Sequence, residues 1–178
     1  MKTQFFNRAE AGEFLAESLS SYANRDDVLV LALPRGGVPV AAEVAKRLNA
    51  PLDVFVVSAE ELIELQRREK TYRAGLQPLE VEGKTAIVVD DGIATGSTML
   101  AAIAALRQLN AARIIVAVPV VAASTYSEMQ RAADDVVAVL VPQDFYAVGL
   151  WYQDFSQTTD EEVRDLLAEA ACTHPVEA

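Results

Sequence analysis

Short apolar runs alternate along the chain with longer segments of helical spacing. Five runs rich in Val, Ile and Leu are continuous, which is typical of strands buried on both faces of a parallel sheet. They predict strands at 28–33, 53–57, 86–90, 113–118 and 136–141. Strands that alternate with helices predict right-handed βαβ units. We therefore expect an α/β, doubly wound, mainly parallel five-stranded sheet, in the order 2-1-3-4-5, with helices on both faces.

The helical segments carry recognisable start signals. Asn7 and Glu10 form a capping pair, and Pro39 lies in the first turn of a helix that runs to about residue 48. Thr159 and Glu162 cap the last helix. Further helices are predicted at 59–72, 98–109 and 124–133. The apolar stripe that follows Asn7 is Ala11, Phe14, Leu15 and Tyr22, and that of the last helix is Val163, Leu166 and Leu167.

Two distinctive loops leave the first and third predicted strands. In the order 2-1-3-4-5 the winding direction reverses between these strands, and ligands bind beyond the carboxyl ends of strands at such a point. The loops are 34–37, with the sequence Pro-Arg-Gly-Gly, and 91–98. We expect them to meet at one crevice.

The loop after the third strand combines paired acids with a small-residue turn at a helix start. Gly96 allows close backbone approach, Ser97 and Thr98 add hydroxyl groups, and the first amides of the helix point to the same place, which predicts a phosphate cradle. A P-loop would require a Lys that is absent here. Asp90 and Asp91 suit ribose hydroxyls and a magnesium ion. The alternative is an acidic turn capped by Ser and Thr.

Composition narrows the classes of partner. The chain has 178 residues and 52% hydrophobic content, which suits one domain spanning 1–178. Its formal net charge of −11 disfavours nucleic acid. Cys172 and His174, the one residue of each type, exclude a disulfide framework, a Cys/His zinc site and a Ser-His-Asp triad. The start lacks a signal-peptide core and the longest apolar run is too short for a bilayer, so we expect a cytoplasmic protein without a membrane partner.

The segment 88–98, Val-Val-Asp-Asp-Gly-Ile-Ala-Thr-Gly-Ser-Thr, resembles the phosphoribosyl pyrophosphate motif of type I phosphoribosyltransferases. The resemblance implies that Asp90 and Asp91 hold the ribose 2′- and 3′-hydroxyls. It implies that the turn binds the 5-phosphate through Ala94, Thr95, Gly96, Ser97 and Thr98. The matching order of strands and helices extends over most of the chain.

The loop 34–37 resembles the pyrophosphate loop of that family, in which a cis peptide is frequent. The resemblance implies that Arg35, with the Gly36 and Gly37 amides, binds the leaving diphosphate, and an Arg suits this role because its planar fork meets phosphate oxygens in pairs. Arg35 thereby joins Asp90 and Asp91 among the expected catalytic residues. The alternative is that the Gly-Gly pair only forms an ordinary turn between a strand and a helix.

An aromatic segment at 142–158, here called the hood segment, follows the last strand. Its similarity to purine phosphoribosyltransferases implies that Phe145 or Tyr146 stacks on an acceptor base and that Asp154, with Asp91, lies near Mg²⁺. Equally, these aromatics can be packing that pins the segment to the domain. Hypoxanthine-guanine enzymes carry an acid at the position of Ala94, so its absence here argues against that substrate.

One departure from the family affects the expected activity. Type I enzymes carry a flexible basic loop, or lid, between the second and third strands. Here only about thirty residues separate Val57 from the third predicted strand, and they open with an acidic helix start. Either this lid is absent, or part of the chain is missing from the sequence. Three hypotheses follow: a phosphoribosyltransferase, a binding or regulatory module that retains the nucleotide site, and a scaffold without a ligand. A homodimer is compatible with the sequence.

Overall fold

A parallel sheet of five strands forms the centre of the molecule in a computed structural model, which describes residues 3–57 and 80–173. The strand order is β2-β1-β3-β4-β5 and every neighbouring pair is parallel, so the predicted topology is confirmed. The strands are β1 (Val28–Ala32), β2 (Leu52–Val54), β3 (Thr85–Val89), β4 (Arg113–Val120) and β5 (Asp135–Leu140).

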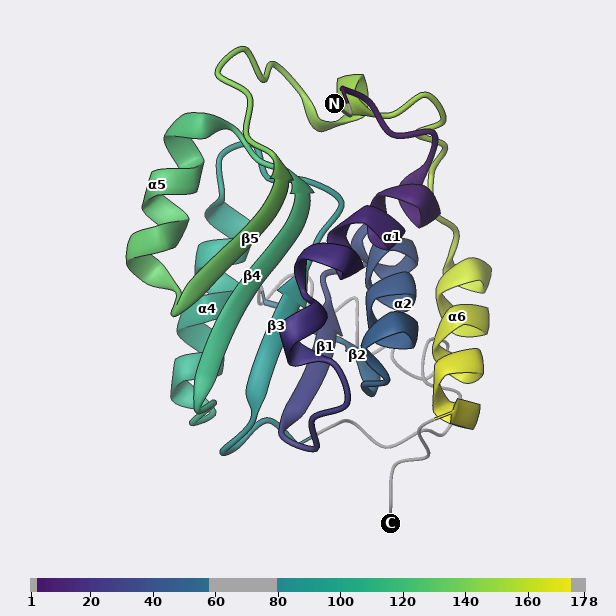
Figure 1. The fold of residues 1–178 in the computed structure, drawn as a ribbon, viewed down its shortest axis with the longest axis vertical. Helices are drawn as coiled ribbons and strands as arrows, with labels where there is room; N and C mark the ends of the chain where they lie inside the picture. Colours follow the sequence, from purple (N-terminus) through teal and green to yellow (C-terminus); the bar gives the residue numbers. More distant parts are fainter. Residues whose placement is uncertain (1–2, 58–79, 174–178) are drawn as a thin grey trace.

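The helices lie on both faces of the sheet (Figure 1). They are α1 (Arg8–Ser18), α2 (Gly37–Leu48), α4 (Ser97–Gln108), α5 (Ala123–Ala132) and α6 (Asp160–Thr173), with short 3-10 helices η1 (Ser20–Tyr22) and η2 (Val148–Trp151). Helices α1, α2 and α6 share one buried cluster with alternate residues of β1, β3 and β4. Helices α4 and α5 share a second cluster with the other residues of the same strands, which face the opposite side of the sheet. Because both faces are covered, the strands are continuous apolar runs, as predicted.

Most predicted boundaries agree with the structure to within two residues. The exceptions are β2, which ends at Val54 rather than at 57, and Tyr22, which lies in η1 rather than on the apolar stripe of α1. The predicted cap of α1 is confirmed: the Glu10 amide donates to the Asn7 side chain at 2.9 Å, and the Phe6 amide donates to the Glu10 carboxylate at 3.1 Å. The predicted helix at 59–72 lies outside the described residues.

The hood segment crosses the carboxyl end of the sheet beside the N-terminal residues (Figure 1). It pairs with them through backbone hydrogen bonds from Phe5 N to Trp151 O at 2.9 Å and from Gln153 N to Phe5 O at 2.8 Å. Phe5 is fully buried, and its ring lies 5.7 Å from that of Tyr152 between centroids. The start of the chain and the hood segment therefore form one unit above the loops that follow β1 and β3.

None of the helices within 3–57 and 80–173 is both long and apolar enough to cross a bilayer.

Helix α1 should contribute to global stability because its apolar face is part of the core. We expect Leu15→Ala, at a fully buried position, to lower the free energy of unfolding by about 2–5 kcal/mol. The matched control Leu109→Ala, at a side chain that is 49% exposed, should change it by less than about 0.5 kcal/mol. Urea denaturation measures both. Equal losses would contradict the assignment of α1 to the core.

Candidate active site

The two loops expected to share a crevice are in direct contact. The Leu33 amide donates to Val89 O at 2.9 Å, which joins the ends of β1 and β3. A Cβ atom added to Gly36 would lie 2.3 Å from Asp91 Oδ2, and one added to Gly37 would lie 2.7 Å from Val89 O. Only glycine lets the first loop approach the acids so closely. The prediction that these loops meet at the reversal of the sheet is confirmed.

The turn before α4 presents backbone donors to solvent. Gly96 has φ of 83°, in the left-handed region, and is followed directly by the first residue of α4. Within the part of the chain that the structure describes, the amides of residues 94–99 donate no hydrogen bond to any protein atom. The side chains around these amides are exposed at Ala94, Thr95, Ser97 and Thr98. Unpaired amides at a helix N-terminus suit an anion.

Helix α5 holds this turn in place. Thr125, which is 5% exposed, donates from Oγ1 to Ala94 O at 2.6 Å. A Cβ atom on Gly96 would lie 2.7 Å from Met129 Cε and 2.9 Å from Thr125 Cγ2. The contacts with α5 therefore fix the turn while its amides stay accessible, so a ligand would find the donors already oriented.

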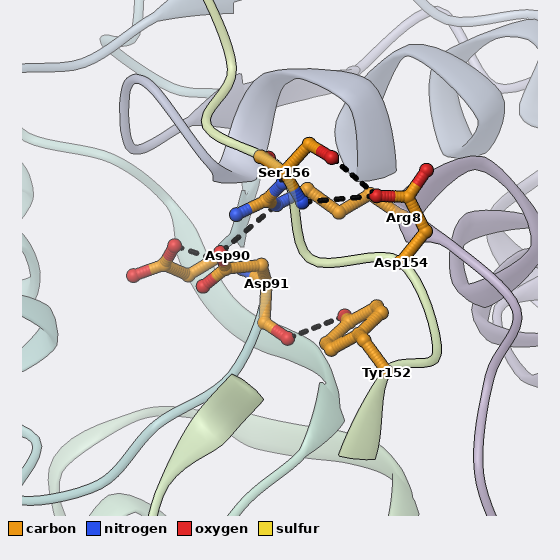
Figure 2. Close-up of polar contacts among 6 residues, drawn as sticks. All are labelled: Arg8, Asp90, Asp91, Tyr152, Asp154 and Ser156. Carbon is orange, nitrogen blue, oxygen red and sulfur yellow. Dashed lines mark hydrogen bonds and ion pairs between the residues drawn. The ribbon is translucent and has the colours of Figure 1, made fainter. Parts of the chain in front are cut away.

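The two acids differ in environment. Asp90 Oδ1 accepts a hydrogen bond from the Asp91 amide at 2.8 Å. Burial, and then the negative charge of Asp91, raise the pKa of Asp90 well above its usual range. Asp91 Oδ2 accepts from Arg8 Nε at 3.1 Å, and the Arg8 and Asp91 side chains are only 12% and 14% exposed (Figure 2). The site therefore contains one carboxylate paired with an arginine and one whose charge is disfavoured.

Arg8 was not among the residues that the sequence predicted for the site. It is the first residue of α1, and it reaches the acids because α1 packs against α2. One signal in the sequence pointed to it: a cation in the first turn of a capped helix opposes the helix dipole. The residue therefore lies in an unfavourable local position that a contact elsewhere has to offset.

The predicted pyrophosphate loop has the expected cis peptide, between Pro34 and Arg35. The Arg35 side chain, however, forms an ion pair with Asp160 at 3.5 Å and is 29% exposed. The Gly37 amide donates to Leu33 O at 3.0 Å, whereas the Gly36 amide has no acceptor in the described residues. Of the two glycine amides, that of Gly36 is thus available to a ligand. Gly37 contributes by having no side chain.

The aromatic residues of the hood segment serve mainly as packing. Phe145 is 6% exposed, its ring stacks on Trp151 at 6.5 Å between centroids, and its carbonyl accepts from Trp151 Nε1 at 3.0 Å. Tyr152 donates from its hydroxyl to Asp91 O at 2.6 Å (Figure 2), and burial raises its pKa. Tyr146 is 83% exposed. Of the two aromatics expected to stack on a base, Tyr146 alone presents its ring to solvent.

The predicted metal residues do not form a preassembled cation site. Asp154 Oδ1 accepts from the Ser156 amide at 3.1 Å and from the Ser156 hydroxyl, and the hydroxyl bond is the main reason that the pKa of Asp154 is lowered. Asp91 is paired with Arg8. Within 3–57 and 80–173, no three Asp, Glu, His or Cys side chains are grouped to hold a metal. A magnesium ion here would need oxygens from a ligand as well.

Comparison with protein families decides the identity of the domain. The model of the phosphoribosyl transferase domain matches residues 3–149, which include both loops and the turn before α4. The chain belongs to this phosphoribosyl transferase family. Membership supports phosphoribosyl transfer in general, without specifying an acceptor.

Relatives of this phosphoribosyl transferase domain extend the comparison. A Mycobacterium tuberculosis (strain H37Rv) protein, whose assignment as a phosphoribosyl transferase is provisional, is 37% identical over 201 residues, covering 89% of this chain but 45% of its own length. The chain thus spans less than half of that relative. The crystal structure of TT1426 from Thermus thermophilus has a TM-score of 0.83 at 34% identity, covering 93% of this chain and 98% of TT1426.

A more distant structure shows the shared fold. The purine phosphoribosyltransferase of Pyrococcus horikoshii aligns with a TM-score of 0.51 at 24% identity, covering 78% of this chain and 87% of that protein. This likeness supports the fold and leaves the substrate open.

Two glycines with positive φ give a matched test of the phosphate turn. Gly83 has φ of 74° with nothing within 4 Å of an added Cβ, whereas Gly96 has φ of 83° and would meet Met129 and Thr125. We expect Gly83→Ala to cost about 1–2 kcal/mol, from left-handed backbone alone. Gly96→Ala should cost a further ~1–3 kcal/mol through overpacking. Urea denaturation of both variants measures the difference, and equal losses would contradict the close packing of the turn on α5.

Proposed function

We propose that this protein transfers the phosphoribosyl group of phosphoribosyl pyrophosphate to a nitrogenous base and releases pyrophosphate. The proposal depends chiefly on one observation: an exposed turn of unpaired amides lies directly after the paired acids Asp90 and Asp91. A phosphate at the turn and a sugar at the acids is the arrangement that a ribose 5-phosphate unit requires. Family membership supports the same class of substrate.

The 5-phosphate is assigned to the turn. Its donors would be the backbone amides and hydroxyls of Ala94, Thr95, Gly96, Ser97 and Thr98. The dipole of α4 adds about 0.3–1 kcal/mol at an exposed site. Each charge-assisted hydrogen bond contributes roughly 1.5–3 kcal/mol, so several of them would supply most of the affinity.

The ribose hydroxyls are assigned to Asp90 and Asp91. A carboxylate accepts hydrogen bonds from a diol through both oxygens. The raised pKa of Asp90 means that a second negative charge beside Asp91 is costly without compensation. Arg8 already offsets the charge of Asp91. A bound cation would offset more of it.

Magnesium is the cofactor that fits these groups. Mg²⁺ is typically bound by one or two carboxylates together with substrate phosphates and water, so it suits a site with carboxylates and no complete protein cage. Asp91 would be its protein ligand, and Asp154 a second one if its bonds to Ser156 open. When bound, the ion would neutralise charge on the diphosphate.

The reaction breaks the bond between ribose C1 and a diphosphate oxygen and forms a bond between C1 and a base nitrogen. The diphosphate leaves with the bonding electron pair, and the base loses a proton. The sugar passes through an oxocarbenium-like state, as in glycoside cleavage. Gly36 N and Arg35 are assigned to the departing diphosphate. The hood segment, fastened by Tyr152 to Asp91 O, would limit the access of water to C1.

A second candidate is a binding or regulatory module that retains the site without turnover. It is favoured by the spacing between strands, since thirty residues separate Val54 from Thr85 where active relatives are expected to carry a longer basic loop. Pyrophosphate release, assayed against a panel of purine and pyrimidine bases, distinguishes the two. Release with any base favours the enzyme.

The acids can be tested with a double substitution. We expect Asp90→Asn with Asp91→Asn to weaken binding of phosphoribosyl pyrophosphate and Mg²⁺, measured by calorimetry, about a hundredfold or more, because two charge-assisted contacts are lost. The melting temperature should change little, since Asn keeps an oxygen acceptor for Arg8, and loss of the disfavoured charge of Asp90 offsets loss of the ion pair. The control Asp26→Asn with Asp144→Asn makes the same charge change at exposed positions and should bind as the wild type does. A comparable loss of folding in the acid variant would show that the acids are structural.

The acceptor assignment predicts a separate effect at Tyr146. With a base that supports release, Tyr146→Ala should raise the KM for that base about two- to tenfold, the worth of one aromatic stacking contact. The Kd for phosphoribosyl pyrophosphate should stay unchanged. Steady-state kinetics and calorimetry measure the two quantities, with Leu109→Ala as the control. An unchanged KM would remove Tyr146 from the acceptor site.

A further inference from the structure

Arg8 is held in an environment that its own helix does not favour. A cation in the first turn of α1 opposes the helix dipole, and burying a guanidinium costs solvation unless it is paired. The side chain is nevertheless only 12% exposed. Its carboxylate partner, Asp91, belongs to the candidate active site. A residue whose charge is unfavourable for its own helix, and which lies beside a candidate active site, is a candidate for a role in binding.

Three contacts fix the orientation of the Arg8 guanidinium. Its face lies over the Phe155 ring, with Cζ 4.1 Å from the ring centroid. Nε donates to Asp91 Oδ2 at 3.1 Å, and Nη1 donates to Ser156 O at 2.5 Å. Nη2 has no acceptor in the described residues. The group is therefore oriented in advance and keeps one donor for a ligand.

The guanidinium lies against the loop that is assigned to the diphosphate. A Cβ atom on Gly36 would be 3.4 Å from Arg8 Nε, so Arg8 lies close to Gly36, the residue whose amide is unpaired among the described residues. Figure 2 shows the side chain reaching across to the two aspartates, with the guanidinium beside Asp91. Arg35, the arginine that the loop itself carries, is paired with Asp160. The arginine that borders both Gly36 and the acids is thus Arg8.

A cavity that Arg8 borders is unsuitable for an anion. It has a volume of about 250 Å³, Gly36 is not among its lining residues, and it is lined by Asn7, Pro39, Asp154, Ser156 and Glu162 among others. The carboxylates of Asp154 and Glu162 would repel an anion in that cavity. A negatively charged group should therefore approach Arg8 from the side of Gly36.

We propose that Arg8 is a binding residue for the diphosphate of phosphoribosyl pyrophosphate and for the pyrophosphate product. The inference rests on the proposed function. With Nε and Nη1 held by protein acceptors, Nη2 would supply a charge-assisted hydrogen bond to a phosphate oxygen. The same side chain balances the charge of Asp91, so it lets a carboxylate for the sugar lie beside a polyanion.

Three ligands separate this role from a structural one. Calorimetry with Mg²⁺ measures the Kd of phosphoribosyl pyrophosphate, of inorganic pyrophosphate and of ribose 5-phosphate, which has no diphosphate. We expect Arg8→Ala to weaken binding of the first two by roughly ten- to a hundredfold, the worth of a charge-assisted hydrogen bond. Binding of ribose 5-phosphate should change less than about twofold.

The matched control is Arg107→Ala. Arg107 lies in the last turn of helix α4, and its side chain is 43% exposed and forms an ion pair with Asp134 at 3.0 Å. The substitution therefore makes the same charge change away from the crevice. All three affinities should match those of the wild type.

A second substitution guards against misfolding. Arg8→Gln carries an amide nitrogen on Cδ, where Arg carries Nε, so it retains a donor for Asp91 but removes the charge and both Nη donors, and it should show the same selective loss. A uniform loss for all three ligands, or no loss, would overturn the proposal. So would failure of both Arg8 variants to fold, which would assign Arg8 to the fold. If the wild type binds neither phosphoribosyl pyrophosphate nor ribose 5-phosphate, the proposed function itself fails, which is a different result.

Discussion

The approach of Gly36 to Asp91 is the constraint on which the site depends. Any side chain at residue 36 would overlap the carboxylate, since even a Cβ atom would lie 2.3 Å from Oδ2. This contact exists because β1 and β3 are neighbours in the sheet and both end at the same edge. It brings an unpaired amide, a carboxylate and the Arg8 guanidinium together within a few ångströms. The turn at Gly96, fixed by α5, then adds the phosphate donors directly after the acids along the chain.

The parts of the fold that sequence could predict are those set by local pattern. Continuous apolar runs located all five strands, and the Asn7 and Glu10 pair located the start of α1, because burial on two faces and capping are properties of a short stretch of chain. The meeting of the two loops also followed, since it needs only the strand order. The early end of β2 and the position of Tyr22 in η1 depend on tertiary packing, which a periodic pattern does not contain.

The parts of the site that sequence could not predict come from segments far apart in the chain. Arg8 and Asp91 are 83 positions apart in the chain. They meet because α1 packs on α2 and because the residues just before α1 form backbone hydrogen bonds with the hood segment. Phe145 and Tyr146 are adjacent and equally aromatic, yet one is 6% and the other 83% exposed. That difference is set by the stacking of Phe145 on Trp151. Identity and spacing suggested a shared role, whereas the tertiary contacts separate the two residues.

Charge balance connects these features to the choice of ligand. A protein of net charge −11 that binds a polyphosphate gains no attraction from its mean field, so affinity has to come from oriented local donors. Amides supply donors without adding a side-chain cation, and they do so at the turn before α4 and at Gly36. The cation embedded beside the acids is already neutralised by Asp91, which makes its burial tolerable before a ligand arrives. A diphosphate that brings Mg²⁺ would shift this balance, because the ion compensates the carboxylates and leaves more of the Arg8 charge for the phosphate oxygens. Selectivity for a diphosphate over a monophosphate at that position would then arise from the ion and the arginine together.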